Sequence, residues 1–164
     1  MNIRIAVPVD ARAIAALISL AYRVEDFFKI GDRTDEDDVR DHMVKSAFLV
    51  LEDETSAEDE GGALAGCVYV DVRGETGYFG MLSIDPSRQG QGLGSRLIAA
   101  AEDHCRKAGC REMELEVVNL RSELPPFYRR FGYVETDTRP FTDHEQAKLP
   151  CHFIVMTKSL LPGA

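Results

Sequence analysis

The spacing of hydrophobic residues divides the chain into expected strands and helices. Apolar residues alternate with polar or small ones at Ile3, Ile5 and Val7, which is typical of a strand. Residues 47–51 are wholly apolar, which indicates a buried strand. The same reasoning predicts further strands at residues 64–72, 78–84, 113–117, 133–136 and 152–157.

Apolar residues three or four positions apart predict helices between these strands. Asp10 and Thr34 suit the N-cap positions of the first two helices, and Gly109 suits the end of the third. The expected helices are residues 10–23, a shorter segment after Thr34, residues 93–108 and a last one at about residues 125–131. The order of elements predicts an α/β (α+β) fold with a mixed sheet and helices on its faces. A length of 164 residues fits one domain, residues 1–164.

Composition narrows the class of protein. The net charge is −9, and six acidic residues without a basic one lie at positions 52–60. We expect a solvated loop tip there, with a cation-steering lip as the alternative. A nucleic-acid partner is disfavoured because no basic face is evident. No apolar run approaches the roughly 20 residues that span a bilayer, and the first 17 residues lack a signal-peptide pattern, so a cytoplasmic protein without a membrane partner is expected.

The cysteines do not have the spacing of metal ligands. Cys67, Cys105, Cys110 and Cys151 form no C-x-x-C pair and lie beside no histidine cluster. We therefore expect no metal, and reduced, buried thiols. No cysteine has an evident histidine partner, which favours direct chemistry over an acyl-cysteine intermediate.

Three glycines at alternate positions follow the predicted strand at residues 78–84 and lead into the longest helix. Free amides at a helix start attract anions, and Gly90, Gly92 and Gly94 remove the side chains that would block a phosphate. A tight turn alone needs fewer glycines. The nucleotide P-loop requires a lysine after its last glycine, but Ser95 stands there, and the G-x-G-x-G spacing departs from the dinucleotide fingerprint.

The run Gln89-Gly90-Gln91-Gly92-Leu93-Gly94 resembles the acetyl-CoA loop of the GCN5-related N-acetyltransferases, the GNAT family. The resemblance extends to residues 80–86 before the loop, and to Asn119 and residues 127–133 after it. It implies an acyl-CoA N-acyltransferase fold with six or seven strands and about four helices. It also implies transfer of an acetyl group from acetyl-CoA to a primary amine, and leaves room for a homodimer.

The resemblance assigns residues to coenzyme A. The backbone of Leu82, Ser83 and Ile84 would pair with the pantetheine arm, and Asn119 would contact the pantetheine or adenine side, although its place in the sequence differs from that in many relatives. A backbone N–H near the first three would also polarise the thioester oxygen. The pyrophosphate would bind the residues of the loop: Gln89, Gly90, Gln91, Gly92, Leu93, Gly94 and Ser95.

Two side chains are candidates for proton transfer. Tyr128 occupies the family position that serves the departing thiolate. A phenol with a pKa of about 10 would stabilise a thiolate of pKa about 8.5 through a hydrogen bond, because full proton transfer is uphill. Glu116 is the candidate base for the amine, and a solvated strand face is its alternative. Glu25 and Asp26 are weaker candidates.

The acceptor is not predicted beyond an amine of a small molecule or of a peptide or protein. Phe27 and Phe28 would form an apolar wall by analogy, or would belong to core and surface. A non-catalytic acyl-CoA-binding module of the same fold is the second functional hypothesis, and a nucleotide-binding protein is the third.

Overall fold

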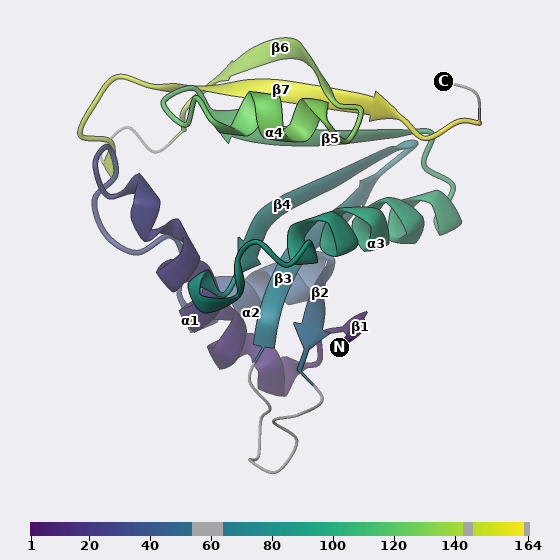
Figure 1. Ribbon diagram of the computed structural model, residues 1–164, viewed down its shortest axis with the longest axis horizontal. Coiled ribbons are helices and arrows are strands. Elements are labelled where there is room, and N and C mark those ends of the chain that lie inside the picture. The colour runs from purple at the N-terminus through teal and green to yellow at the C-terminus, as the bar shows by residue number, and fades with distance from the viewer. Residues whose placement is uncertain (54–63, 143–145, 163–164) are drawn as a thin grey trace.

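The computed structural model describes residues 1–53, 64–142 and 146–162, so the acidic stretch beyond Asp53 lies outside the described residues. The described strands form one mixed sheet in the order β1-β2-β3-β4-β5-β7-β6 (Figure 1). These strands are β1 (Asn2–Ile5), β2 (Ala47–Glu52), β3 (Leu64–Arg73), β4 (Thr76–Ile84), β5 (Glu112–Val118), β6 (Val134–Pro140) and β7 (His152–Ser159). The expected mixed sheet of six or seven strands is confirmed.

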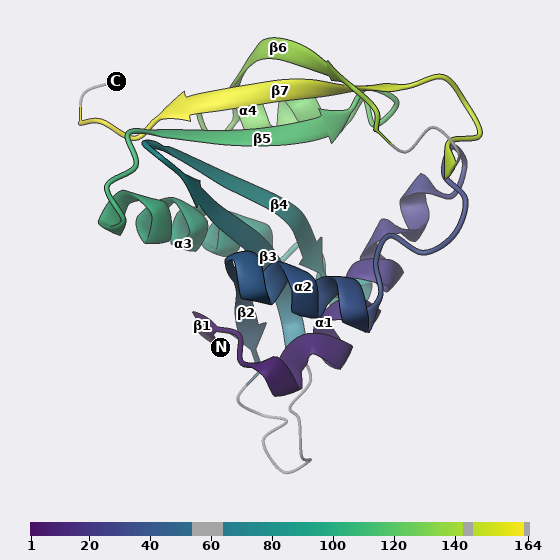
Figure 2. The ribbon, with the colours of Figure 1, turned by 180° about the vertical axis from the view of Figure 1, so that it is seen from behind.

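Helices cover both faces of the sheet. On one face α1 (Ala11–Ala21) and α2 (Glu36–Lys45) lie across β2, β3 and β4 (Figure 2). On the other face lie α3 (Leu93–Lys107), which packs on β3 and β4, and the short α4 (Leu124–Arg129). Three single-turn 3-10 helices, η1 (Pro8–Asp10), η2 (Tyr22–Glu25) and η4 (Pro86–Arg88), flank α1 and precede α3.

Asp10 occupies the predicted N-cap position of α1 but its side chain does not cap the helix, and the predicted Thr34 cap of α2 was wrong. Asp10 has helical backbone angles, and its carboxylate accepts from the Val7 N–H at 2.8 Å and from Arg4 at 2.8 and 3.0 Å, so it is committed upstream of α1. Asp35, not Thr34, caps α2, because its carboxylate accepts from the Asp38 N–H at 2.8 Å. In both cases the side chain of the predicted cap hydrogen-bonds to another polar group instead of the first amides of the helix.

A partly buried ion pair joins α3 to the far half of the sheet. Lys158 on β7 donates from Nζ to both carboxylate oxygens of Glu102 on α3, at 2.8 and 3.0 Å. The Tyr133 hydroxyl donates to the same carboxylate at 3.4 Å. Glu102 is only 7% exposed, so its charge depends mainly on these partners and little on water.

The sheet splits in the middle. β4 and β5 run parallel and pair only at Thr76–Tyr78 with Glu112–Glu114, after which they diverge. Just beyond that point β4 has a bulge, where Met81 and Leu82 face the single residue Val68 of β3, and Met81 adopts a φ of 51°. A non-glycine residue in this region is strained, and a bulge leaves its backbone groups outside the regular ladder. The sheet is thus opened beside β4.

The remaining expectations concern thiols and membranes. Cys67, Cys105 and Cys110 are buried and all four cysteines are free, whereas Cys151 is half-exposed and so not the buried thiol expected. Burial raises the pKa of Cys67 to about 12, which makes it a poor nucleophile. No helix in the described ranges is long and apolar enough to cross a bilayer.

Candidate active site

The glycine turn between β4 and α3 has two residues that need glycine for their own backbone. Gly90 and Gly92 have φ values of 84° and 73°, in the left-handed region, and Gly92 is the N-cap of α3. A Cβ on either would meet no atom within 4 Å, so their requirement is conformational, not steric. Within the described residues no side chain caps the first amides of α3, which are therefore available to a ligand.

Gly94 needs to be glycine neither for its backbone angles nor for lack of space around it. It lies in the first turn of α3, and a Cβ there would meet only Cζ of Phe127, at 3.9 Å, which is ordinary van der Waals contact. Alanine is preferred to glycine in a helix by about 1 kcal/mol. The fold therefore gives no reason for a glycine at this position, whereas an anion that approaches the amides closely would give one.

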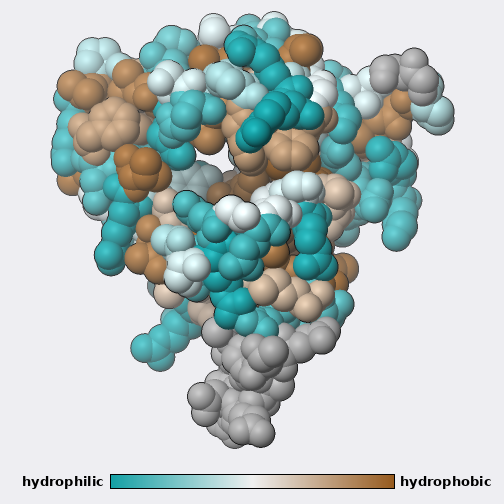
Figure 3. Space-filling view, viewed as in Figure 1, coloured by the Kyte–Doolittle hydropathy of each residue, from teal (hydrophilic) through white to brown (hydrophobic). Residues whose placement is uncertain are grey.

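A cleft of about 960 Å³ runs from this turn to the opening beside β4. Figure 3 shows this face of the molecule hollowed between the layer that carries α4 and the layer below it. One wall consists of residues of the turn and the start of α3, namely Arg88, Gln89, Gly90, Gly92, Gly94 and Ser95. The opposite wall consists of Arg121, Leu124, Phe127, Tyr128, Arg130 and Phe131.

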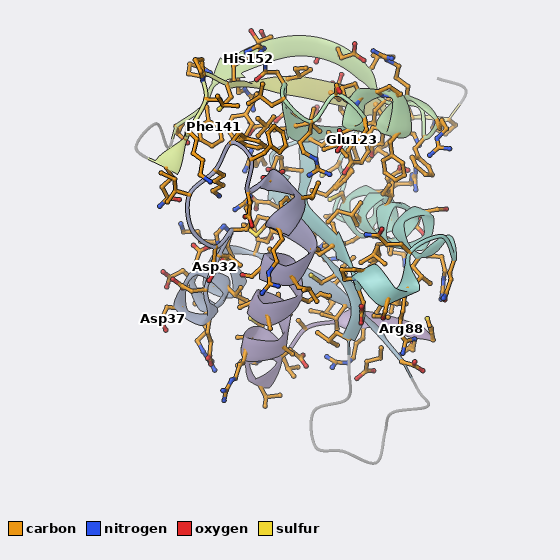
Figure 4. The ribbon with its side chains drawn as sticks, turned by 60° about the vertical axis from the view of Figure 1, so that its left-hand side comes forward. Asp32, Asp37, Arg88, Glu123, Phe141 and His152 are labelled. Carbon is orange, nitrogen blue, oxygen red and sulfur yellow. The ribbon has the colours of Figure 1, made fainter. Side chains whose placement is uncertain are left out.

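The charged residues that line the cleft are arginines. Among its described lining residues three are arginines (Arg88, Arg121 and Arg130) and none is acidic, although the net charge is −9. Figure 4 labels Arg88 on one side of the cleft and, on the other side, Glu123, which lies two residues after Arg121. Arg88 pairs with Asp53, and the Arg130 guanidinium lies 5.4 Å from the Phe127 ring centre. The cleft suits an anionic ligand with an apolar part.

A second cavity, of about 250 Å³, lies between the diverging strands β4 and β5. It shares four lining residues with the cleft: Tyr22, Leu82, Leu124 and Tyr128. The bulged segment of β4 and the Tyr128 side chain therefore stand where the two spaces meet. A ligand lying along the cleft would present its end to this cavity, and a second reactant would approach from the other side.

Tyr128 is held in a cluster of aromatic rings. Its ring centre lies 5.0 Å from that of Phe127, 5.9 Å from that of Phe79 and 6.3 Å from that of Tyr133. The residue is 7% exposed, and burial raises the pKa of its hydroxyl well above the ordinary value of 10.0. The phenol therefore stays protonated at neutral pH and can donate a hydrogen bond at the junction of the two cavities.

Glu116 lines the inner cavity, but its carboxylate is already paired. Arg139 on β6 donates from Nη1 to Glu116 at 2.6 Å and from Nη2 to Glu114 at 3.0 Å, so one guanidinium holds both acids. The acids raise the pKa of Arg139 far above its ordinary value. The candidate base is therefore already hydrogen-bonded to a guanidinium.

Of the other residues that the sequence assigned to coenzyme A, some line the cleft and some do not. Leu82, Ile84 and Leu93 line the cleft, whereas Ser83 is buried with its hydroxyl donating to the Met81 carbonyl at 3.0 Å. Gln91 is exposed and does not line the cleft. Asn119 also lies outside the lining, with its Oδ1 accepting from the His152 N–H at 2.8 Å. That bond joins the end of β5 to the start of β7.

An ion pair that sequence reasoning did not predict ties η2 to the wall of the cleft. Arg121 Nη1 donates to Glu25 at 2.9 Å and Nε donates to Glu123 at 2.6 Å. Glu25 is 6% exposed and its carboxylate is committed to this bridge, while Asp26 is exposed. Residues in irregular loops have no periodicity to reveal such a contact, and 96 positions separate Arg121 from Glu25.

The aromatic pair at the end of η2 divides between core and surface. Phe28 is fully buried, and Phe27 is 54% exposed with its ring 4.9 Å from that of Phe28. Phe141 and Phe153 supply the apolar wall of the inner cavity instead. Among the described residues no group of His, Cys, Asp and Glu has the arrangement of a metal site.

Comparisons of the sequence identify relatives. A model of the Acetyltransferase (GNAT) family matches residues 15–133. Glucosamine 6-phosphate N-acetyltransferase 1 of Oryza sativa subsp. japonica is 31% identical over 104 residues, which cover 60% of this chain and 57% of that protein. Blasticidin-S acetyltransferase of Streptomyces morookaense is 39% identical over 80 residues, which cover 48% of this chain and 57% of that protein. The matched part thus spans little more than half the length of either relative.

Comparisons of the structure agree over the whole fold. The ribosomal-protein-S18-alanine N-acetyltransferase of Escherichia coli superposes with a TM-score of 0.74 at 19% identity, covering 99% of this chain and 96% of that one. The yncA protein of Salmonella typhimurium, whose structure holds its cofactor acetyl-CoA, superposes with a TM-score of 0.71 at 19% identity, covering 99% and 95%. These likenesses confirm the acyl-CoA N-acyltransferase fold.

Proposed function

This chain belongs to the GNAT acetyltransferase family, and from that premise we propose that it transfers an acetyl group from acetyl-CoA to a primary amine by direct attack on the thioester. The observation that carries the proposal is the glycine turn. It opens on a cleft with three arginines and no acid among its described lining residues, and the other end of that cleft reaches Tyr128 and the bulge of β4. A donor with phosphates at one end and a thioester at the other fits both ends.

Backbone groups would make most of the contacts to the donor. The amides of residues 89–95 would hold the pyrophosphate at the start of α3, where the helix dipole favours negative charge. Leu82, Ser83 and Ile84 lie beyond the stretch of β4 that pairs with β5, so those of their backbone groups that point away from β3 would pair with the pantetheine arm. The strained Met81–Leu82 segment would aim an N–H at the thioester oxygen and stabilise the charge that develops there.

In the reaction the amine nitrogen forms a bond to the acetyl carbon and the carbon–sulfur bond breaks. Tyr128 would donate a hydrogen bond to the departing thiolate. Because burial raises the pKa of the phenol further above that of a thiol, it stabilises the thiolate without giving up its proton. The amine loses its proton to Glu116 or, since Arg139 holds that carboxylate, to water leading away from the cavity.

The pairing of Glu114 and Glu116 with one arginine also favours a second candidate function. A chain without an available base would bind acyl-CoA without turnover and serve as a sensor or regulatory module. The same fold would then carry only the donor half of the site.

The test measures binding and turnover separately. Calorimetry with CoA and with ATP distinguishes the proposed donor from a nucleotide, and a preference for ATP would refute the whole proposal. Thiol release from acetyl-CoA in the presence of small amines, amino acids and peptides then measures transfer. Turnover of none of them alongside tight CoA binding would favour the non-catalytic module.

The role of Tyr128 has a matched control in the same aromatic cluster. Tyr128→Phe is expected to lower kcat by about 100-fold, within the range for a lost proton-transfer or hydrogen-bonding group, and to leave the Kd for CoA within about threefold. Tyr133→Phe removes the hydroxyl of a buried tyrosine that lines neither cavity and should leave kcat unchanged. Equal kcat values for Tyr128→Phe and the wild type would contradict the assigned role.

A further inference from the structure

The inner cavity is lined by an arginine that makes no ion pair within the described residues. Its described lining includes the charged residues Glu25, Lys29, Arg33 and Glu116. Both glutamates are paired with arginines of the cavity's surroundings: Glu25 with Arg121 and Glu116 with Arg139. The Arg33 guanidinium, in contrast, has no carboxylate within salt-bridge distance among the described residues, although it is half-buried.

Three of the four aspartates that line the outer cavity with Arg33 make contacts elsewhere, and the fourth, Asp32, is exposed. Asp35 caps α2, Asp38 accepts from the Thr34 hydroxyl, and Asp71 pairs with Arg73 at 3.0 Å. Each of these aspartates lines the outer cavity of about 830 Å³ that Arg33 also lines. The Arg33 guanidinium is therefore available to a ligand, because among the described residues it makes no ion pair and lies over the Tyr22 ring.

Arg33 lies where three cavities adjoin. Besides the inner cavity and the outer one of about 830 Å³, it lines a third of about 330 Å³. Its loop, marked by Asp32 in Figure 4, lies across from the loop that carries Phe141. The guanidinium carbon lies 5.4 Å from the centre of the Tyr22 ring, and Tyr22 also lines the cleft of the donor.

Contact with an aromatic ring orients the guanidinium without using its N–H groups. An arginine fork binds carboxylate and phosphate oxygens in a bidentate manner, and the bond strengthens where water is partly excluded. Close to the guanidinium itself, a second cationic group on the acceptor would be repelled. The ligand complementary to this arrangement carries an anionic group as well as an amine.

We propose that the acetyl acceptor is a small amine that bears a carboxylate or a phosphate, and that Arg33 binds this anionic group while the amine faces Tyr128 and the thioester. The inference rests on the proposed acetyl transfer. It adds a specificity-determining residue and a substrate class: amino acids and amino-sugar or aminoalkyl phosphates, in preference to neutral or polycationic amines. A cavity of about 250 Å³ suits molecules of that size.

Matched substrate pairs test the proposal. Thiol release from acetyl-CoA is measured with glucosamine 6-phosphate against glucosamine, and with phenylalanine against phenylalaninamide. We expect kcat/KM to be higher for the anionic member of at least one pair, and the pair that responds tells phosphate from carboxylate. Arg33→Ala should lower kcat/KM for the substrate with the anionic group by about 10- to 100-fold, the loss expected for a charge-assisted contact. It should change kcat/KM for the matched substrate without that group by less than about threefold. Arg33→Lys should restore part of the loss.

Arg12→Ala is the control, because Arg12 is exposed on α1, lines none of these cavities and carries the same charge. It should leave both members of each pair unchanged. Preference for the neutral members, or equal losses for both members in Arg33→Ala, would overturn the proposal. If no amine is acetylated, the proposed function fails, and calorimetry of glucosamine 6-phosphate and phenylalanine in the presence of CoA decides the inference alone. Binding that Arg33→Ala weakens supports it, and absent or unaffected binding overturns it.

Discussion

Substitution of the third glycine of the turn separates the needs of the fold from those of the ligand. Gly94→Ala places a methyl group in open space beside the first amides of α3, with Phe127 at 3.9 Å as the only neighbour within 4 Å. Alanine favours the helix and restricts the unfolded chain, so the free energy of unfolding should rise by about 0.5 to 1 kcal/mol. For a chain of this length that raises Tm by about 1 to 4 °C.

The same methyl group should weaken the binding of CoA. It would stand between the amides and a phosphate, and loss of one charge-assisted hydrogen bond costs about 1.5 to 3 kcal/mol, which is about 10- to 100-fold in Kd. The variant is thus expected to be more stable and to bind less tightly. Thermal unfolding without ligand and calorimetry with CoA measure the two effects on one preparation.

Two neighbouring substitutions provide the comparison. Gly92→Ala forces alanine to a φ of 73° and should lower the unfolding free energy by about 1 to 2 kcal/mol, in addition to weakening CoA binding. Gly109→Ala imposes similar strain, at a φ of 93°, beyond the other end of α3 and should leave the Kd for CoA unchanged. If Gly94→Ala binds CoA as tightly as the wild type, the reasoning that assigns this glycine to the ligand is refuted. A lowered Tm would refute the statement that the fold does not need it.

Two further predictions concern ion pairs. Lys158→Met leaves the Glu102 carboxylate with only the Tyr133 hydroxyl as a partner, and should lower the unfolding free energy by about 3 kcal/mol. The double variant Lys158→Met, Glu102→Gln should regain most of this loss, because it removes the unpaired charge. Urea unfolding of both variants measures the difference. Arg4 lowers the pKa of Asp10, so their interaction stabilises the fold above the ordinary value of 3.8 and is lost as pH falls through the lower folded-state pKa. Arg4→Met should therefore cost about 0.5 to 1 kcal/mol at pH 7 and progressively less below pH 4, and an equal cost at pH 3 and pH 7 would contradict this account.

The regular elements were predictable because their physical causes are local. The apolar run at β2, the alternation in β5 and the glycine turn before α3 each act within a few residues, and the structure has all three. β6 was predicted too short, ending at Thr136 instead of Pro140. Its residues are mostly exposed, so pairing with β7 and not an apolar pattern keeps them in a strand.

The donor side of the candidate site was more accessible to sequence reasoning than the acceptor side. A backbone that must remain bare leaves glycines in the sequence, and a helix start leaves its own pattern. Arg33 and Arg121 lie in loops, where no periodicity marks them, and their meaning comes from residues far away in the chain. The pairing of Glu116 with Arg139 likewise depends on how β5, β7 and β6 are ordered, which no local pattern states.

The split between β4 and β5 also separates strand pairs that can form early in synthesis from those that can form only later. All strand pairs among β1 to β4 form within the first 84 residues, and those among β5 to β7 form within residues 112–159, with three residue pairs joining the halves. During synthesis the first half completes its strand pairing while β4 is still an edge strand, open to other chains until β5 emerges. A break in the segment between Lys107 and Glu112 would therefore yield two fragments, each with its own paired strands, whose reassembly could report when the two halves meet.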